Sequence, residues 1–311
     1  MDSQNHGRLE TAIELLSPYL HGKENALRLA LTCVFSRGHL LVEDLPGLGK
    51  TTLAIALAKI LGLSFGRIQC TSDLLPSDIT GLSIFNKDKS AFEFHPGPIF
   101  NHIVLVDEIN RATPKTQSAL LEAMGEKQVT IEGKTYDLPK PFFVIATQNP
   151  VEQFGTFPLP ESQLDRFMLK ISIGYPPREA ERDILKGGSR RREIYSIEPM
   201  MSGAEVLETQ DFIKNSVYVS DKVLDYMLNI IEATRSSRYL LAGLSTRGAL
   251  ALIHTAKANA YFKGKDFVVP ENVKAVAEYV IPHRVLFKEE YEGANKKEVV
   301  KSLLGEIPVP A

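Results

Sequence analysis

The sequence predicts an α/β fold: a parallel β-sheet with helices on both faces and β-hairpin insertions, followed by a small all-α domain. Short apolar runs typical of buried strands alternate with helical patterns, as in parallel α/β proteins. The strand signals fade after Pro176-Pro177, and helical patterns follow. We therefore expect an α/β domain over residues 1–176 and a helical domain over residues 177–311.

Buried strands are predicted at residues 39–42, 65–70, 103–106, 142–146 and 169–173. Helices of the first domain are predicted at residues 8–20, 24–37, 51–61 and 113–124, the last capped by Thr113 with Pro114 in its first turn. Helices of the second domain are predicted at residues 178–186, 220–236, 245–262 and 270–280.

Two segments interrupt the alternation of strands and helices in the first domain. Residues 83–94 read as strand, polar turn and strand, with the turn at Lys87-Asp88-Lys89. Residues 129–138 alternate apolar and polar side chains around Gly133. Each pattern fits a β-hairpin inserted into the α/β core, and each also fits a surface loop.

The composition narrows the class of protein. The formal net charge of −2 argues against a dedicated nucleic-acid binder, and the basic cluster at residues 190–192 fits a solvated loop. Two cysteines, Cys33 and Cys70, form no disulfide framework and fit a reducing compartment. No apolar run reaches membrane-spanning length and the N-terminus lacks a signal-peptide pattern, so we expect a cytoplasmic protein without membrane insertion.

One segment between a predicted strand and a predicted helix has the make-up of a phosphate-binding loop. It consists of Pro46, Gly47, Leu48, Gly49, Lys50, Thr51 and Thr52. Glycines let backbone N–H groups turn toward phosphates, and the helix N-terminus favours an anion. Lys50 would contact the β- and γ-phosphates, and Thr51 would place its hydroxyl on Mg²⁺. Asp44 stands where the general pattern begins with glycine, so this segment alone also fits an ordinary glycine turn.

An acidic pair, Asp107-Glu108, directly follows the predicted strand 103–106. We expect this strand next to the strand that precedes the phosphate-binding loop. Asp107 could then hold Mg²⁺ with its hydration shell, and Glu108 could orient and polarise the attacking water. Acidic residues at strand ends often only begin a loop. In combination with the loop at Lys50, however, this pair predicts hydrolysis of a nucleoside triphosphate.

Three further residues are candidates for the same reaction. Asn149 follows the predicted strand 142–146 and could help to hold the water near the γ-phosphate, although an Asn before a proline also forms turns. Arg166 precedes a strand and Arg247 begins a helix of the second domain. Either arginine could meet the charge that develops during phosphoryl transfer, and either also fits an ordinary surface position.

These motifs, in this order, resemble the AAA+ ATPases and, within them, the MoxR family. The resemblance covers nearly the whole chain and rests on four stretches: residues 43–51, 106–112, 146–150 and 159–167. It implies a P-loop NTPase fold whose second domain is a helical lid. An acidic or varied residue at position 44 is usual in that family, so the departure at Asp44 loses its weight.

The resemblance also implies roles for the matching residues. Lys50 and Thr51 correspond to Walker A, Asp107 and Glu108 to Walker B, and Asn149 to sensor 1. Arg166 corresponds to the arginine finger, which in AAA+ rings projects into the nucleotide site of the neighbouring subunit. Arg247 corresponds to sensor 2, although this chain has Ser-Thr-Arg-Gly where the family more often has Ser-Pro-Arg-Ala. His21 and Gly22 fall where AAA+ proteins contact adenine.

The resemblance implies ATP and Mg²⁺ as cofactors and a homo-oligomer, expected to be a hexameric ring. It further implies chaperone-like remodelling or maturation of partner proteins, with a von Willebrand factor A domain protein as the expected partner. Two alternatives stay open at this point. One is a motor stimulated by nucleic acid, which Lys87, Lys89 and Lys134 in the hairpins permit. The other is a nucleotide-dependent binding switch, which the intact Asp107-Glu108 pair disfavours.

Overall fold

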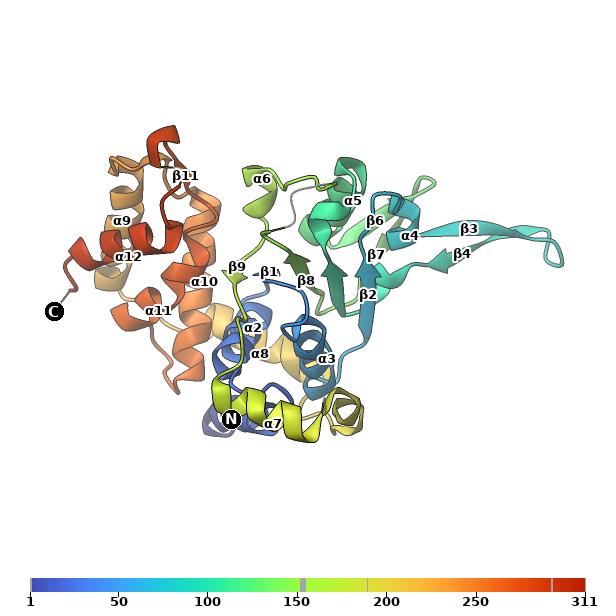
Figure 1. Ribbon diagram of the computed structural model, residues 1–311, viewed down its shortest axis with the longest axis horizontal. Coiled ribbons are helices and arrows are strands. Elements are labelled where there is room, and N and C mark those ends of the chain that lie inside the picture. The colour runs from blue at the N-terminus through green and yellow to red at the C-terminus, as the bar shows by residue number, and fades with distance from the viewer. Residues whose placement is uncertain (1, 152–154, 189, 292, 311) are drawn as a thin grey trace.

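A five-stranded parallel sheet forms the centre of the α/β part, in the order β2-β5-β8-β1-β9 (Figure 1). The computed structural model describes residues 2–151, 155–188, 190–291 and 293–310. The strands are β1 (Leu40–Glu43), β2 (Phe65–Gln69), β5 (Ile103–Asp107), β8 (Phe143–Gln148) and β9 (Leu169–Ile171). They lie where the sequence predicts strands, so the predicted parallel sheet is confirmed.

One expected neighbour relationship is wrong. The strand that ends in Asp107 was expected next to β1, but β8 lies between β5 and β1 and pairs with both. Strand order depends on which side of the sheet each crossover helix covers, and local sequence patterns do not contain that information. As a consequence, the carboxyl end of β8 lies between the phosphate-binding loop and Asp107.

Both faces of the sheet are buried, because successive side chains of each strand point to opposite faces. Leu40 and Val42 belong to one apolar cluster and Leu41 to another. The helices α1 (Asp2–Leu16), α2 (Glu24–Phe35) and α3 (Lys50–Ile60) contribute to the first cluster, and α5 (Pro114–Glu126) contributes to the second. Two short helices, α4 (Pro76–Thr80) and α6 (Glu161–Leu164), complete this part.

Both inserted segments are β-hairpins, as one of the two sequence interpretations predicted. Strands β3 (Gly81–Asn86) and β4 (Ala91–Pro96) pair antiparallel, as do β6 (Gln128–Ile131) and β7 (Lys134–Asp137). The β3–β4 hairpin projects far from the body of the molecule (Figure 1). At its tip, Lys89 is ion-paired with Glu93 at 2.6 Å.

Among the described residues after the sheet, the structure has six α-helices. They are α7 (Arg178–Gly187), α8 (Gly203–Ser216), α9 (Asp221–Ser236), α10 (Thr246–Phe262), α11 (Pro270–Val280) and α12 (Lys296–Glu306). The sequence predicted α7, α9, α10 and α11, but not α8, α12 or the short antiparallel pair β10 (Leu240–Ala242) and β11 (Leu286–Phe287). The N-terminus of α8 had a readable signal, because Ser202 and Glu205 form a capping box. Over the described ranges, no helix has the length and apolar character needed to cross a membrane.

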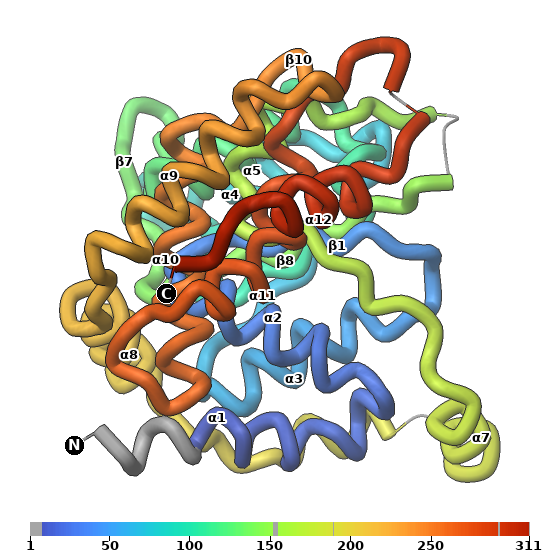
Figure 2. The backbone as a smooth tube through the Cα atoms, turned by 90° about the vertical axis from the view of Figure 1, so that its left-hand side faces the viewer, coloured from blue at the N-terminus to red at the C-terminus, as the bar shows by residue number. Residues whose placement is uncertain are grey.

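The elements that follow α7 form two groups. Helix α8 contacts α2 and α10, and residues 190–196 contact α3, so this stretch lies beside the N-terminal helices (Figures 1 and 2). Helices α9–α12 form the second group, where α10 contacts α11 and α12 contacts α9. Pro176-Pro177 therefore marks the end of the sheet region, and the domain boundary placed there stays a prediction.

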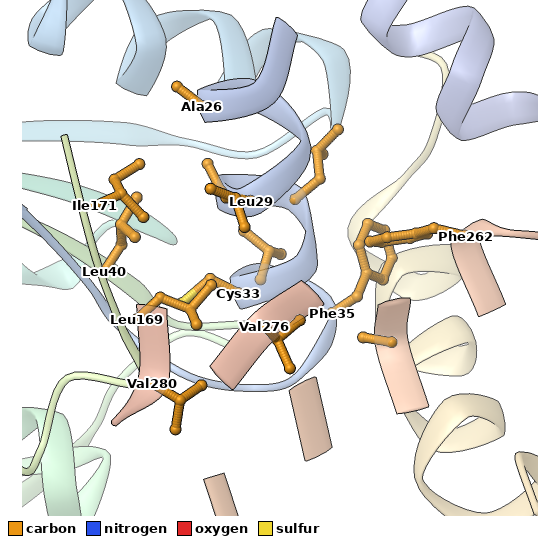
Figure 3. Packing of buried hydrophobic residues seen from close by; sticks show 14 of the residues in the cluster. Ala26, Leu29, Cys33, Phe35, Leu40, Leu169, Ile171, Phe262, Val276 and Val280 are labelled. Carbon is orange, nitrogen blue, oxygen red and sulfur yellow. The ribbon is translucent and has the colours of Figure 1, made fainter. Parts of the chain in front are cut away.

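The apolar core runs from the sheet into the second group of helices (Figure 3). Cys33 and Phe35 of α2 belong to the same buried cluster as Leu169 of β9 and Val276 of α11. The ring of Phe35 meets that of Phe262 on α10 edge to face, with centroids 5.7 Å apart. Because α10 and α11 share this core with α2 and β9, the packing of apolar side chains fixes their orientation relative to the sheet.

Candidate active site

The phosphate-binding loop connects β1 to α3 at the carboxyl edge of the sheet. Gly47 and Gly49 have φ angles of +83° and +93°, a region that side chains with a Cβ rarely adopt. A Cβ added to either glycine would meet no atom within 4 Å, so both residues face open space. Helix α3 begins at Lys50, directly after this turn. The loop thus offers backbone N–H groups and a helix N-terminus to an anion.

Asp44, the residue that departs from the general loop pattern, has a structural role. Its carboxylate accepts hydrogen bonds from the hydroxyl of Ser172 at 2.8 Å and from the backbone N–H groups of Ile173 and Gly174. Lys23 is buried and donates to the carbonyls of Ile173 and Gly174. These bonds attach the start of the loop to the segment that follows β9. A glycine at position 44 would lose all the bonds made by the carboxylate.

A cavity of about 330 Å³ brings the predicted phosphate and metal residues together. Its lining includes Pro46, Gly47, Gly49, Lys50, Thr51, Thr52, Asp107 and Glu108. The Lys50 ammonium donates to the carbonyls of Asp44 at 2.7 Å and Leu45 at 3.2 Å, within the loop. Burial lowers the pKa of Lys50, and the nearby carboxylates of Asp44 and Asp107 oppose that shift. A cation in this position is placed to meet a phosphate chain.

Asp107 is held from two sides at the end of β5. The Arg67 guanidinium of β2 contacts Asp107 Oδ2, with Nη2 at 2.7 Å and Nε at 2.8 Å. The hydroxyl of Thr147, at the end of β8, donates to Asp107 Oδ1 at 3.2 Å. Thr147 is completely buried, and it reaches Asp107 because β8 lies beside β5. The carboxylate therefore has a fixed orientation toward the cavity.

Glu108 leaves the strand in a left-handed conformation, with φ +56°. Residues other than glycine rarely adopt this region, and such strain concentrates at functional sites. The Thr147 hydroxyl accepts the backbone N–H of Glu108 at 2.9 Å. The Glu108 carboxylate receives Gln69 Nε2 at 3.1 Å and lies 3.4 Å from Arg111 Nη1. The turn after β5 thus directs one carboxylate, Asp107, and then a second, Glu108, into one cavity.

The donors in this cavity suit Mg²⁺. Mg²⁺ prefers hard oxygen ligands and usually uses one or two protein groups together with substrate phosphates and water. The hydroxyl of Thr51 and the carboxylate of Asp107 both line the cavity. No group of three or more His, Cys, Asp or Glu side chains suited to a metal gathers in the part of the chain that the structure describes. The Thr51 hydroxyl and the Asp107 carboxylate therefore fit Mg²⁺ as two oxygen ligands beside the phosphate-binding loop.

A second cavity, of about 260 Å³, adjoins the first and shares Gly47, Gly49 and Thr52 with it. His21 and Leu48 line it, together with Tyr19, Ile184 and Arg190. Apolar and aromatic surface beside a phosphate site is suited to a nucleotide base. The predicted adenine contact at His21 thus lies beside the loop.

Gly22 has a different position from His21. It does not line the second cavity as described by the structure. Its φ angle is +67°, and an added Cβ would lie 2.3 Å from Cδ of Pro177. Gly22 therefore lets the backbone pack closely against Pro177, the residue just before α7. Pro176, the residue before Pro177, lines the second cavity, so the contact at Gly22 supports one wall of that cavity. Gly22 does not itself contact the space for the base.

Asn149 lies outside the first cavity as the structure describes it, whereas Thr147 lines that cavity two residues earlier. The Asn149 side-chain oxygen accepts the backbone N–H of Val151 at 3.2 Å. This is the turn that an Asn before a proline forms. In this conformation, the side chain that connects the ends of β5 and β8 is the threonine.

Arg166 and Arg247 lie together, away from the loop. Both are exposed and line a third cavity of about 310 Å³ between α5, the segment before β9, and α10. Arg166 Nη1 donates to the carbonyl of Leu121 at 2.6 Å. Among the residues that the structure describes, none lines both this cavity and the one at Lys50. The two arginines therefore do not complete the site of their own chain in this conformation.

Sequence reasoning missed several residues at these sites. Arg67 and Gln69 occupy alternate positions of β2, so both point to one face, and Thr147 is the last residue but one of β8. Polar residues at alternate positions near the carboxyl end of a strand were a sequence signal for site residues. The residues that they contact, however, could not be predicted, because these depend on the strand order. Arg284, which lines the third cavity, had no local motif and contacts residues more than a hundred positions away.

Comparisons with known proteins place these sites in context. Residues 39–169 match the family model of the "ATPase family associated with various cellular activities (AAA)", and residues 232–303 match that of the "AAA lid domain". The lid match falls within α9–α12. The first match contains the loop at Lys50, the Asp107-Glu108 pair and Arg166, and the second contains Arg247 and Arg284.

Several relatives match most of the chain. YeaC of Bacillus subtilis, described as uncharacterized, is 43% identical over 98% of this chain and 96% of its own. Chaperone MoxR1 of Mycobacterium tuberculosis is 38% identical over 89% of this chain and 75% of its own. Protein MoxR of Paracoccus denitrificans is 28% identical over 98% and 97%. A crystal structure of a presumed ATPase from Cytophaga hutchinsonii superposes with a TM-score of 0.91, at 39% identity, over 98% of this chain and 96% of that one.

Proposed function

Because the chain belongs to the MoxR family of AAA+ ATPases, we propose that it hydrolyses ATP with Mg²⁺ at sites shared between the subunits of a ring. We further propose that hydrolysis is coupled to chaperone-like remodelling of partner proteins. The observation that carries the proposal is the separation of two sets of residues. Lys50, Asp107 and Glu108 line one cavity, and Arg166 and Arg247 line another.

The first cavity supports hydrolysis rather than binding alone. Glu108 and Thr147 are placed at the end of β5 and β8, where a water beyond the phosphate chain would lie. Glu108 orients and polarises this water, and Lys50 meets the negative charge of the phosphates. Thr51 and Asp107 would hold Mg²⁺, which would supply further stabilisation of that charge. A nucleotide-dependent switch without turnover would not need a carboxylate such as that of Glu108 directed into the phosphate-binding cavity.

The third cavity supports a role for Arg166 and Arg247 in a neighbouring subunit. An exposed pair of guanidinium groups is suited to a phosphate, but the described lining of this cavity shares no residue with the phosphate-binding cavity at Lys50. A heterologous, head-to-tail contact brings two different faces of identical subunits together, and closes into a ring when the rotation fits. In that arrangement Arg166 and Arg247 act on the nucleotide of the adjacent subunit.

A mixing experiment tests this arrangement. Arg166→Ala subunits keep Lys50, and Lys50→Ala subunits keep Arg166, so each variant alone is inactive. In a random equal mixture, about a quarter of the interfaces combine an intact Lys50 with an intact Arg166. We expect phosphate release to recover accordingly, measured at protein concentrations that favour assembly. A mixture as inactive as its components would contradict the shared site.

The chaperone-like role is supported by the name of the relative, Chaperone MoxR1. The resemblance to the MoxR family implies a partner that carries a von Willebrand factor A domain. Glu108→Gln should bind ATP and barely turn it over, which would trap the complex with its partner for capture. Recovery of the same proteins with Lys50→Ala, which lacks the ATP-bound state, would contradict nucleotide-dependent engagement.

Stimulation by nucleic acid remains the competing hypothesis. The tip of the β3–β4 hairpin offers little free positive charge, because Lys89 is paired with Glu93 and Asp88 lies beside Lys87. Phosphate release with and without single-stranded DNA distinguishes the two functions. A large stimulation that is lost at raised salt would favour a nucleic-acid motor over the proposed function.

A further inference from the structure

We propose that Arg284, through its ion pair with Asp165, is a positioning residue that holds Arg166 and Arg247 on one face for the neighbouring subunit. This inference rests on the proposed function, since it concerns the reaction at a shared site. Arg284 lies in the loop after α11 and is distant in the sequence from Arg166 and Arg247.

The Arg284 side chain is almost completely buried, with 2% of its surface exposed. Its Nε donates to Asp165 Oδ1 at 2.9 Å. Its two terminal nitrogens donate to the carbonyls of Asp165, Phe167 and Met168, and to that of Val280, the last residue of α11. A single guanidinium therefore fixes the backbone on both sides of Arg166. Lysine could not replace it, because an ammonium cannot span these separated acceptors.

The Asp165 carboxylate extends the connection to α10. Its Oδ2 lies 3.5 Å from the hydroxyl of Ser245, the N-cap residue of α10. Ser245 also accepts the backbone N–H of Gly248 at 3.0 Å, so its position sets the first turn of the helix. Arg247 is in that turn. Asp165 thus connects the segment that carries Arg166 to the turn that carries Arg247.

The positive charge around the third cavity explains why Arg166 and Arg247 need the Arg284–Asp165 pair to hold them in place. Five cationic side chains line the third cavity: Arg37, Lys127, Arg166, Arg247 and Arg284. Arg37 is paired with Asp211, and Asp165 is the acidic residue among the described lining of the cavity. Like charges at this density repel each other when no anion is present. Arg247 itself disfavours the charged form of Arg284. Asp165 offsets this repulsion, and the backbone bonds of Arg284 prevent Arg166 from turning away.

The burial of the Arg284–Asp165 ion pair determines how the pair responds to substitution of either residue. Burial lowers the pKa of Arg284 to about 10, and the nearby Asp165 carboxylate counteracts that shift, so the guanidinium stays charged near neutral pH. Removing one partner of a buried pair leaves the other charge uncompensated. The segment at residues 165–168 would then lose its fixed place against α11. The cavity at Lys50 shares no described lining residue with this region, so nucleotide binding should survive.

The test uses two variants, Arg284→Lys and Asp165→Asn, with Arg238→Lys as the matched control. Arg238 is exposed in the loop after α9, and its guanidinium contacts the neighbouring Tyr239. We expect either test variant to lower kcat for ATP hydrolysis by about tenfold or more, since small misplacements of a catalytic group have effects of this size. KM for ATP and the affinity for a fluorescent ATP analogue should stay close to wild type. Arg238→Lys should change neither.

Mixing then separates positioning from general damage. Adding Lys50→Ala subunits, which have an intact Arg284, should restore turnover to either test variant, as we expect for Arg166→Ala. A variant with wild-type kcat would overturn the inference. So would a defect that Lys50→Ala fails to rescue while the Arg166→Ala mixture recovers. If the Arg166→Ala mixture itself fails, the shared site of the proposed function falls as well. Thermal melting followed by circular dichroism identifies a variant that does not fold. In that case, the result for the other variant tests the inference.

Discussion

Arg67 of β2 and Asp107 of β5 form an ion pair inside the cavity of the phosphate-binding loop, with Arg67 Nη2 at 2.7 Å from Asp107 Oδ2. The two strands are neighbours in the sheet, with Gln69 opposite Asp107 in the register. Arg67 therefore places a tethered positive charge on a carboxylate that is also suited to a metal ion. A cation that binds Asp107 has to compete with this guanidinium.

Arg67→Ala should lower the Mg²⁺ concentration needed for nucleotide binding. The Arg67 side chain is 47% exposed, so solvent screens the pair. We expect a two- to fivefold change at most, about the value of exposed ion pairs. The measurement is a Mg²⁺ titration of binding of a fluorescent ADP analogue. Arg67→Lys keeps a cation and should stay nearer to wild type, and an unchanged Mg²⁺ requirement in Arg67→Ala would contradict competition.

Thr147→Val should reduce turnover while leaving ATP binding intact. The substitution keeps the shape of a fully buried side chain but removes the hydroxyl that contacts Asp107 Oδ1 and the Glu108 N–H. Bonds to charged groups contribute about 1.5–3 kcal/mol, so we expect kcat to fall by about tenfold to a hundredfold. Steady-state phosphate release measures the effect. Thr147→Ser retains the hydroxyl as the control, and wild-type kcat in Thr147→Val would show that the contact is dispensable.

Stability should decrease as the pH falls from about 6.5 to about 4, because of buried His39. The backbone N–H of Val144 donates to Nδ1 at 3.0 Å, and Nε2 lies 3.2 Å from the carbonyl of Met124, which fits a neutral ring. Burial lowers the pKa of His39 from 6.5 to about 4. Between these values the unfolded chain binds a proton and the folded chain does not, so acid favours unfolding by roughly 3 kcal/mol.

Urea unfolding at several pH values measures the slope that His39 causes. His39→Gln should be less stable at neutral pH and should show a smaller loss of stability on acidification over this range. His95 is exposed, and His95→Gln serves as the control that keeps the wild-type slope. A slope unchanged by His39→Gln would assign the acid sensitivity to other groups, such as the buried His283, whose pKa is also lowered by burial.

Gly22→Ala should destabilise the protein and weaken nucleotide binding together. Its φ of +67° strains any residue with a Cβ, and the Cβ would lie 2.3 Å from Pro177 Cδ. Backbone strain of this kind costs about 1–3 kcal/mol, and relief by moving Pro177 would displace the wall of the second cavity. Thermal melting and binding of a fluorescent ATP analogue measure the two effects.

Gly187→Ala is the matched control for Gly22→Ala. Gly187 ends α7, and an added Cβ would meet no atom within 4 Å. Alanine there should be neutral or slightly stabilising, since it favours a helix more than glycine does. A Gly22→Ala protein with wild-type melting and affinity would show that the segment accommodates the side chain without the predicted strain.

The sequence by itself determined the loop at Lys50, the Asp107-Glu108 pair and most elements around them. These features are local: apolar runs, caps and glycines act within a few residues, so their patterns are visible in the chain. The two hairpins were predicted as one of two interpretations. Helix α12 and the β10–β11 pair were not predicted, because packing against other elements stabilises them more than their intrinsic helix or strand propensity does.

Tertiary structure decided which residues meet. Only the strand order put Thr147 between the loop and Asp107 and gave Arg67 its carboxylate. Only the packing of α10 and α11 on the sheet placed Arg247 beside Arg166 and buried Arg284 against Asp165. Such contacts join residues up to 119 positions apart, and they follow from the burial of a shared core rather than from any local pattern.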